Sequence, residues 1–340
     1  MLCSDSQRSS ERMNFPISEK RLKPFRDCPF RKEQPFISLS LFVHNDEKIA
    51  VCSENTIYIY SSACMVPEKF EHSLGIEWEE EKVKFSKRSI NGTFECFALE
   101  SSKSIGKLRA VLCCENICVA ISEAQIICWN YETGKVNMIT LCGVYVRAMS
   151  LYKEYKDEKE VIRVIVAGKD QGIENSVYVH IFNLDPKTLE FNSRRTQLER
   201  EGMNEVHSLT NICIGQDRLV VAGTFTGGII VWTLGKTEKT KSRRVHRAIT
   251  ACMVAYDGKQ NFISPILISC SNDLTIRVCE LETLDQLCLL SGHSTFVQSV
   301  TIASFFDGVQ PLLISASEDK TIKVWNLVSL KCIQTFEGDL

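Results

Sequence analysis

The sequence has no long hydrophobic run of the kind that membrane-spanning segments require. None of its apolar stretches approaches the roughly 20 residues needed to cross a bilayer. The first 14 residues are too polar for a secretory signal peptide. The sequence also has no large excess of charge of one sign, because 40 Lys and Arg are balanced by 42 Asp and Glu. The whole protein therefore has no electrostatic field that would attract nucleic acid or an acidic membrane. We therefore expect a protein of the cytoplasm or the nucleus that makes no use of a membrane.

Paired C-x-x-C elements, which structural zinc sites use, are absent from the sequence. The chain does have 16 cysteines, but a disulfide framework is typical of short secreted chains, and this chain is long and carries no export signal. Several cysteines stand in alternating apolar runs, where a free cysteine acts as a small hydrophobic side chain. These are Cys52, Cys118, Cys128, Cys213, Cys252, Cys270 and Cys288. We predict reduced thiols, no metal site and no cofactor.

Familiar catalytic motifs are missing as well. Neither a G-x-S-x-G nucleophile elbow nor an H-E-x-x-H zinc motif occurs. Gly235-Lys236-Thr237 is similar to the end of a phosphate-binding loop, but Ile230 stands where that loop requires a glycine. We predict that the protein is not an enzyme.

What the sequence does contain is a repeated unit of two short strands. Residues 312–326, LLISASEDKTIKVWN, show two β-branched runs joined by a tight polar turn. The pattern returns clearly at residues 266–280 and 218–233, and more weakly at 164–183, 117–130 and 48–61. Because the apolar residues alternate with period two inside each run, we predict an all-β fold with little helix.

An aromatic residue or its equivalent closes the second strand of each copy. The six closing positions are Tyr60, Trp129, Phe182, Trp232, Cys279 and Trp325. The last four intervals are close to fifty residues, which is enough for one four-stranded antiparallel sheet per interval. His246 follows Trp232 by fourteen residues and His293 follows Cys279 by the same distance, so two copies share one internal spacing.

The last copy carries a family resemblance. Gly292-His293, Ser315, Asp319 and Trp325-Asn326 resemble the Gly-His to Trp-Asp signature of WD-repeat β-propellers. The resemblance covers about residues 36–336 and implies a β-propeller, in which four-stranded antiparallel blades are arranged around a channel. Six repeats are visible, and the sequence leaves open a seven-bladed propeller or a truncated ring.

The domain organisation follows from the repeats. Residues 1–35, with four prolines and a slight positive excess, are predicted to form an irregular N-terminal arm. Residues 36–340 are predicted to form the propeller. An insertion or a degenerate repeat is expected at about residues 62–93, where the gap between closing positions is longest.

Two sets of polar residues resemble a hydrolase triad. They are His293, Ser315, Asp319 and Trp325 in the last copy, and His246, Ser269 and Asp273 in the copy before it. The family resemblance implies a structural network in both, in which the histidine of a loop bonds the aspartate of a turn. Such networks satisfy buried polar groups and fix turn geometry.

A basic run, KTEKTKSRRVHR at residues 236–247, is the strongest local charge in the repeat region. It is read either as a solvated edge strand guarded by lysines or as a grip for an anionic partner such as an acidic peptide, a phosphopeptide or RNA. The candidate partner-binding residues are Lys239, Lys241, Arg243, Arg244, Arg247, Phe225 and Phe296.

The sequence is consistent with two hypotheses about the function. The first is a non-enzymatic scaffold or adaptor, which binds proteins or peptides through the propeller loops and belongs to a multi-subunit complex. A substrate receptor of a ubiquitin ligase is one version of this hypothesis, and no residue selects it. The alternative is a module that reads nucleic acid or phosphate through the basic run.

Overall fold

The computed structural model divides the chain into two compact units, Met1–Gln34 and Pro35–Leu340. All residues described below belong to the second unit. They are residues 38–44, 46–52, 56–61, 75–80, 83–90, 94–101, 107–141, 144–156, 159–170, 177–200, 205–235, 240–257, 264–303 and 311–337. The predicted arm at residues 1–35 lies outside them.

Six antiparallel sheets, named A to F in chain order, contain all the described strands. Sheet A has the order β1-β2-β3-β6-β5-β4, with β1 (Ser38–His44), β2 (Asp46–Cys52), β3 (Thr56–Ser61), β4 (Gly75–Glu80), β5 (Val83–Ile90) and β6 (Phe94–Ser101). Sheet B contains β7 (Ala110–Cys114), β8 (Ile117–Ile121), β9 (Gln125–Asn130) and β10 (Val136–Thr140). Sheet C contains β11 (Val144–Lys156), β12 (Lys159–Asp170), β13 (Val177–Leu184) and β14 (Phe191–Arg200).

The remaining three sheets repeat the same meander of four strands. Sheet D contains β15 (Val206–Ile214), β16 (Asp217–Thr224), β17 (Gly228–Thr233) and β18 (Thr240–Arg244). Sheet E contains β19 (Thr250–Tyr256), β20 (Ile266–Ser271), β21 (Ile276–Glu280) and β22 (Gln286–Leu290). Sheet F contains β23 (Val297–Ala303), β24 (Leu312–Ser317), β25 (Thr321–Asn326) and β26 (Lys331–Glu337).

The all-β prediction is confirmed, because the described residues contain strands and turns and no helix. None of them therefore forms a helix that could cross a bilayer. Each closing position lies on the third strand of its sheet. Trp325 on β25, for example, stands opposite Leu313 on β24, and Cys279 on β21 stands opposite Leu267 on β20.

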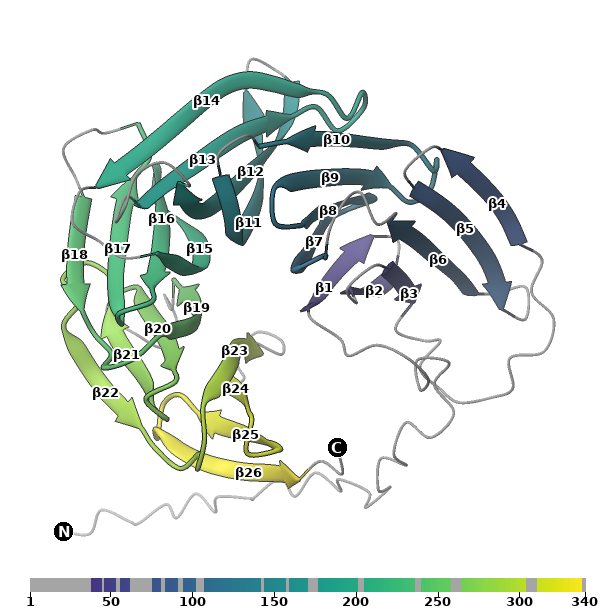
Figure 1. Ribbon diagram of the computed structural model, residues 1–340. Helices are drawn as coiled ribbons and strands as arrows, with labels where there is room; N and C mark the ends of the chain where they lie inside the picture. The colour runs from purple at the N-terminus through teal and green to yellow at the C-terminus, as the bar shows by residue number, and fades with distance from the viewer. Residues whose placement is uncertain are drawn as a thin grey trace, which may run out of the picture. The chain divides into compact units, whose positions relative to one another are not determined.

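Successive sheets pack on one another through their first strands. The contacts run from β1 to β7, β11, β15, β19 and β23, and Figure 1 shows these strands on the inner side of their sheets. Five hydrophobic clusters fill the junctions A–B, B–C, C–D, D–E and E–F. The core is thus a series of sheet-on-sheet interfaces, and each sheet relies on its neighbours to bury its apolar faces.

Burial follows from a sheet's place in this series. Strands β8, β17 and β20, in sheets B, D and E, are buried at every position, as expected of strands covered on both faces. In strand β24 of sheet F only Leu313 and Ser315 are buried, and the other four positions are half-buried. Sheet F is therefore well covered on one face only.

The region predicted as an insertion or degenerate repeat contributes two strands to sheet A. β4 and β5 follow one another as a hairpin and join the sheet through β6, so that sheet A has six strands. Residues 62–74 lie outside the described residues.

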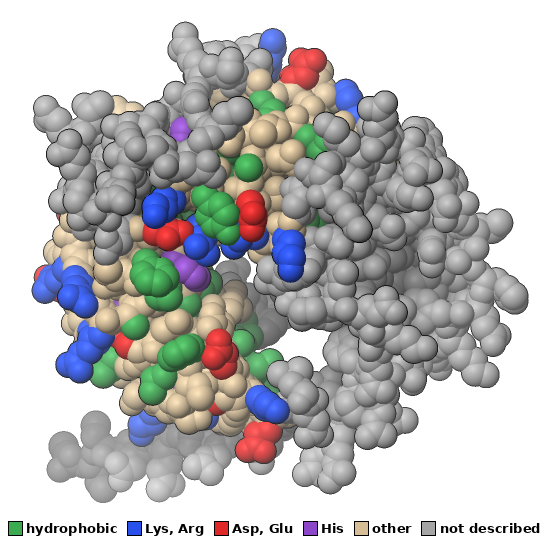
Figure 2. All heavy atoms as spheres, in the orientation of Figure 1, with side chains coloured by type: hydrophobic (Ala, Val, Ile, Leu, Met, Phe, Trp, Pro, Cys, Tyr) green, Lys and Arg blue, Asp and Glu red, His purple; other side chains and the backbone are tan. Residues whose placement is uncertain are grey.

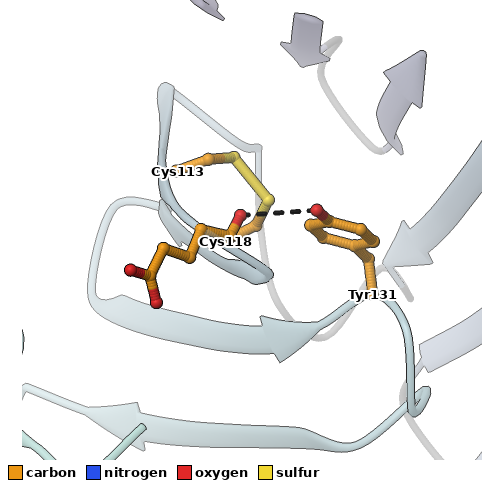
Figure 3. Close-up of a disulfide and its surroundings, with 4 residues drawn as sticks. Cys113, Cys118 and Tyr131 are labelled. Carbon is orange, nitrogen blue, oxygen red and sulfur yellow. Dashed lines mark hydrogen bonds between the residues drawn. A yellow bond between two sulfur atoms is a disulfide. The ribbon is translucent and has the colours of Figure 1, made fainter. Parts of the chain in front are cut away.

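One expectation about the cysteines is wrong. Cys113 and Cys118 stand directly opposite each other in the β7–β8 hairpin, with their Cα atoms 4.3 Å apart, and form a disulfide. The hydroxyl of Tyr131 donates a hydrogen bond to the carbonyl of Glu115 in the hairpin turn at 3.4 Å (Figure 3). A sequence argument based on compartment could not detect this pair, because the pairing depends on the hairpin register.

Candidate functional site

One end of each sheet carries the turn between the second and third strands and the linker that enters the first strand. We call this end the rim. In sheets D, E and F the turn donates the same backbone hydrogen bond to the linker: Phe225 to Glu205 at 2.8 Å, Asn272 to Ile249 at 3.1 Å and Glu318 to Phe296 at 3.0 Å. The repeat therefore fixes the rim in the same way three times.

A second feature shared by these turns is a residue in the left-handed conformation. Gly227, Leu274 and Lys320 occupy equivalent positions with φ of 83°, 70° and 64°. At Gly227 a Cβ atom would lie 2.3 Å from the carbonyl oxygen of His246, so only glycine fits there. Leu274 accepts a conformation that is uncommon for its type, and its side chain is exposed.

The last repeat contains a chain of four polar side chains beneath the rim. Trp325 donates from Nε1 to Oγ of Ser315 at 2.9 Å, and Ser315 lies 2.8 Å from Nε2 of His293. Nδ1 of His293 lies 2.9 Å from Oδ2 of Asp319. Since an ionised carboxylate only accepts, Nδ1 carries the proton of this bond.

Sheet E contains the same arrangement without the indole. His246 lies 2.8 Å from Oγ of Ser269 and 3.0 Å from Oδ2 of Asp273. Cys279 occupies the position that the tryptophan holds in sheet F, so it supplies no donor to the serine. Both serines have no exposed surface. A nucleophile must reach its substrate, so this geometry supports a role in orienting the turns.

The two aspartates of these networks remain ionised for a local reason. Burial alone would raise the pKa of Asp273, but hydrogen bonds from His246, from Thr275 and from the backbone N–H of Arg247 outweigh it and hold the pKa well below its usual range. Burial alone would also raise the pKa of Asp319, but hydrogen bonds from Thr321, from the backbone N–H of Ser294 and from His293 outweigh it, so this pKa is lowered too. Each carboxylate thereby ties a linker to a turn.

Exposed apolar side chains project from this fixed frame. Phe225 lies in the β16–β17 turn, Leu274 in the β20–β21 turn and Phe296 directly before β23, and all three are exposed. They come from three successive sheets at the same end. In the view of Figure 2 apolar side chains of the described residues lie among side chains of both charges rather than in one continuous patch.

A cluster of paired charges continues the rim across sheets B to D. The guanidinium groups of Arg109 and Arg147 lie 4.7 and 4.9 Å from the ring centroid of Tyr145. Arg109 bonds Glu123 at 2.9 Å, and Arg147 bonds Glu205 at 2.5 Å. The hydrogen bond that Glu123 accepts from Arg109 lowers the pKa of Glu123. These arginines are neutralised locally and do not form an open basic surface.

The basic run divides between the perimeter and the rim. Lys241 donates to the carbonyl of Glu282 at 2.5 Å, and Arg243 forms an ion pair with Asp285, so both side chains reach the β21–β22 turn of sheet E. Arg244 and Arg247 are exposed at the rim end, although Arg244 also approaches the carbonyl of His246 at 3.4 Å. Lys239 lies outside the described residues.

The structure thus brings part of the predicted set together. Phe225, Phe296, Arg244 and Arg247 share the rim with both histidine networks, whereas Lys241 and Arg243 point toward the neighbouring sheet. Sequence reasoning missed Leu274, because nothing in its local pattern shows that it occupies the turn position that glycine holds in sheet D. It also missed the Arg147–Glu205 pair, whose members are far apart in the chain.

Comparison with known proteins bears on the last repeat. Residues 284–326 match the family model described as WD domain, G-beta repeat. This segment contains the outer strand of sheet E and the first three strands of sheet F. A search of curated proteins finds no match to the chain.

Proposed function

Starting from the premise that the chain is a WD-repeat protein with a propeller-type fold, we propose that it is a non-enzymatic scaffold whose rim on sheets D, E and F binds another protein. The single observation that carries this proposal is the set of exposed apolar side chains, Phe225, Leu274 and Phe296, on a frame fixed by repeated hydrogen bonds. Aromatic anchors beside arginines are typical of binding hot spots.

The rigidity of the rim supports binding. The backbone bonds and the aspartate networks hold the linkers before a partner arrives, so association loses little conformational entropy on this side. Arg244 and Arg247 add charge at the edge of the apolar residues. We infer an adaptor that presents this surface to a partner within a larger assembly.

The charge pattern favours a protein partner over nucleic acid. Binding to a phosphate backbone depends on unpaired cations, whereas Lys241, Arg243, Arg109 and Arg147 already have partners in the described structure. Two exposed arginines remain at the rim end of sheet D. Three exposed apolar side chains, Phe225, Leu274 and Phe296, lie at the same end of sheets D, E and F.

The experiment places a photo-crosslinking amino acid at Phe225 or Phe296 in the full chain inside cells. We expect crosslinked protein adducts of defined mass at both rim positions. The matched control is Val328, which exposes 51% of its surface, as Phe225 does, but lies in the β25–β26 turn at the opposite end of sheet F. The same adducts at Val328, or adducts removed by nuclease, would contradict the proposal.

A further inference from the structure

Sheets B and C form a pocket of about 410 Å³ at the end opposite the rim. Its walls come from the β7–β8 and β9–β10 turns of sheet B, and from the start of β12 and the β13–β14 turn of sheet C. The volume is in the range of small-molecule sites, which combine apolar surface with a few polar groups. The charged residues of its lining are Glu115, Lys135, Glu160 and Lys187.

The backbone around this pocket is fixed by side-chain hydrogen bonds. Oδ1 of Asn130 accepts bonds from two backbone N–H groups of the β9–β10 turn, both at 3.1 Å, and Oδ1 of Asp185 does the same in the β13–β14 turn at 2.8 and 3.1 Å. Asn137 of β10 donates to the carbonyl of Leu189 at 2.7 Å, which joins sheet B to sheet C. The pocket therefore has a defined shape before any ligand enters.

The two carboxylates of the lining share one cation. Nζ of Lys153 donates to Oε1 of Glu115 at 2.5 Å and also forms an ion pair with Glu160. The hydrogen bond to Glu115 raises the pKa of Lys153, so this ammonium group stays charged at neutral pH. Both carboxylates are thus engaged, and they do not neutralise the two lysines of the lining.

Lys135 and Lys187 are the available cations of the pocket. Both are exposed, and within the part of the chain that the structure describes neither side chain has an ion pair or a hydrogen bond. With Lys153, three ammonium groups stand against two carboxylates, so the pocket has an excess of positive charge. Thr133 also lines it, and its hydroxyl accepts the backbone N–H of Lys135 at 3.3 Å, which leaves the hydroxyl proton to donate.

We propose that this pocket binds a small-molecule phosphate monoester through Lys135, Lys187 and Thr133. A phosphate monoester carries a charge of about −1.5 to −2 at pH 7 and offers three acceptor oxygens, which match two ammonium groups and one hydroxyl. Lysine binds phosphate as a point charge. Pro186 lies in the same wall and supplies apolar surface for the rest of the ligand.

Isothermal titration of the full chain with glycerol 3-phosphate tests the proposal. We expect saturable binding at low salt, no binding of glycerol and weaker binding of acetate, which has one charge. Lys135→Ala and Lys187→Ala should each weaken binding by about tenfold, because each removes a hydrogen bond between charged groups.

Lys331→Ala is the matched control. Lys331 is also exposed, and it follows Asn326 by five residues at the start of β26, as Lys135 follows Asn130 before β10. This variant should bind as the natural chain does. Weakening by Lys331→Ala equal to that by Lys135→Ala would show attraction to overall charge and would overturn the proposal.

The arginine variants separate the site from the fold. Lys135→Arg and Lys187→Arg keep the charge and should retain most of the affinity, and all variants should keep the circular dichroism of the natural chain. A natural chain that does not bind glycerol 3-phosphate at millimolar concentration would overturn the proposal. Equal affinity for acetate would overturn it too, and equal affinity for inorganic phosphate would exclude a monoester as the preferred ligand.

Discussion

Asp319 illustrates how much one side chain determines at the rim. It accepts hydrogen bonds from the backbone N–H of Ser294 at 2.9 Å and from Thr321, while it also contacts His293. Its linker partners and its turn partners are more than twenty residues apart in the chain. This one carboxylate therefore joins the linker to the turn, in addition to the backbone hydrogen bond from Glu318 to Phe296.

The lowered pKa of Asp319 predicts a specific acid sensitivity. The folded state binds its proton less readily than the unfolded chain does, so this group stabilises the fold above its ordinary pKa near 4 and ceases to do so as the pH falls further. We expect Asp319→Asn to lower the free energy of unfolding by roughly 1–3 kcal/mol at pH 7 and to flatten its loss below pH 4. Urea unfolding at several pH values measures both effects.

The matched control for this variant is Glu282→Gln, a change at an exposed residue with no carboxylate bond in the described structure. An acid profile that is the same for Asp319→Asn and the natural chain would show that the network is not the source of the pH dependence.

The residues of the histidine networks could be identified from the sequence, whereas those of the arginine cluster could not. His293, Ser315 and Asp319 occur at fixed spacings within one repeat, so a local pattern includes them all. Arg147 and Glu205 belong to different sheets, and their 2.5 Å contact exists only once sheets C and D pack. The exposure of Leu274 could not be predicted from the sequence either, because the equivalent turn position is glycine in sheet D and lysine in sheet F.

The β7–β8 hairpin is closed by a disulfide bond as well as by strand pairing. The disulfide joins Cys113 and Cys118 across the two-residue turn, and Lys153 of sheet C bonds Glu115 in that turn at 2.5 Å. The hairpin is thus fixed within its own sheet and against the next one.

Reduction of this disulfide is predicted to weaken the fold. Cross-linking so short a loop is expected to contribute roughly 2 kcal/mol through the entropy of the unfolded chain. A reductant should lower the free energy of unfolding by that amount, and the double variant Cys113→Ala, Cys118→Ala should no longer respond to it. Cys213→Ala, at an exposed free thiol, is the control. Peptide mapping that finds both thiols free in the native protein would refute the prediction.

Strand β18 shows why one sequence feature supported two interpretations. The sequence of the basic run suggests one continuous cationic surface. In a strand, however, successive side chains point to opposite faces of the sheet. Lys241 and Arg243 therefore share the face toward sheet E and contact its turn, while the run continues to the rim at Arg244 and Arg247. The sequence could predict the strand and its charge, but the register determines where each charge lies.

For the whole molecule, the alternation of apolar residues was sufficient to predict the all-β fold and the four-stranded unit. It was not sufficient for β4 and β5, because their sequences GIEWEE and VKFSKRSI are rich in charge and were predicted as an insertion or a degenerate repeat. Their membership of sheet A depends on pairing with β6, which no local pattern reveals.

Stacking in series predicts uneven stability across the molecule. Sheet E is covered by a neighbour on both faces and sheet F on one, so local opening of sheet F should cost less free energy. We expect amide hydrogens of β25 to exchange faster with deuterium than those of the equivalent strand β21, measured by mass spectrometry at low protein concentration. Equal exchange in the two strands would show that sheet F is as well covered as its neighbour.

The left-handed tip shared by three turns has an evolutionary consequence. Its backbone geometry is the same whether the residue is glycine, leucine or lysine, and in the latter two the side chain extends into solvent, away from the buried junctions. Substitutions among exposed tips can therefore alter which molecules the protein recognises while the architecture beneath stays intact. The recognition surface can thus change at Leu274 and Lys320 without a change in the packed core, whereas Gly227 has no room for a side chain.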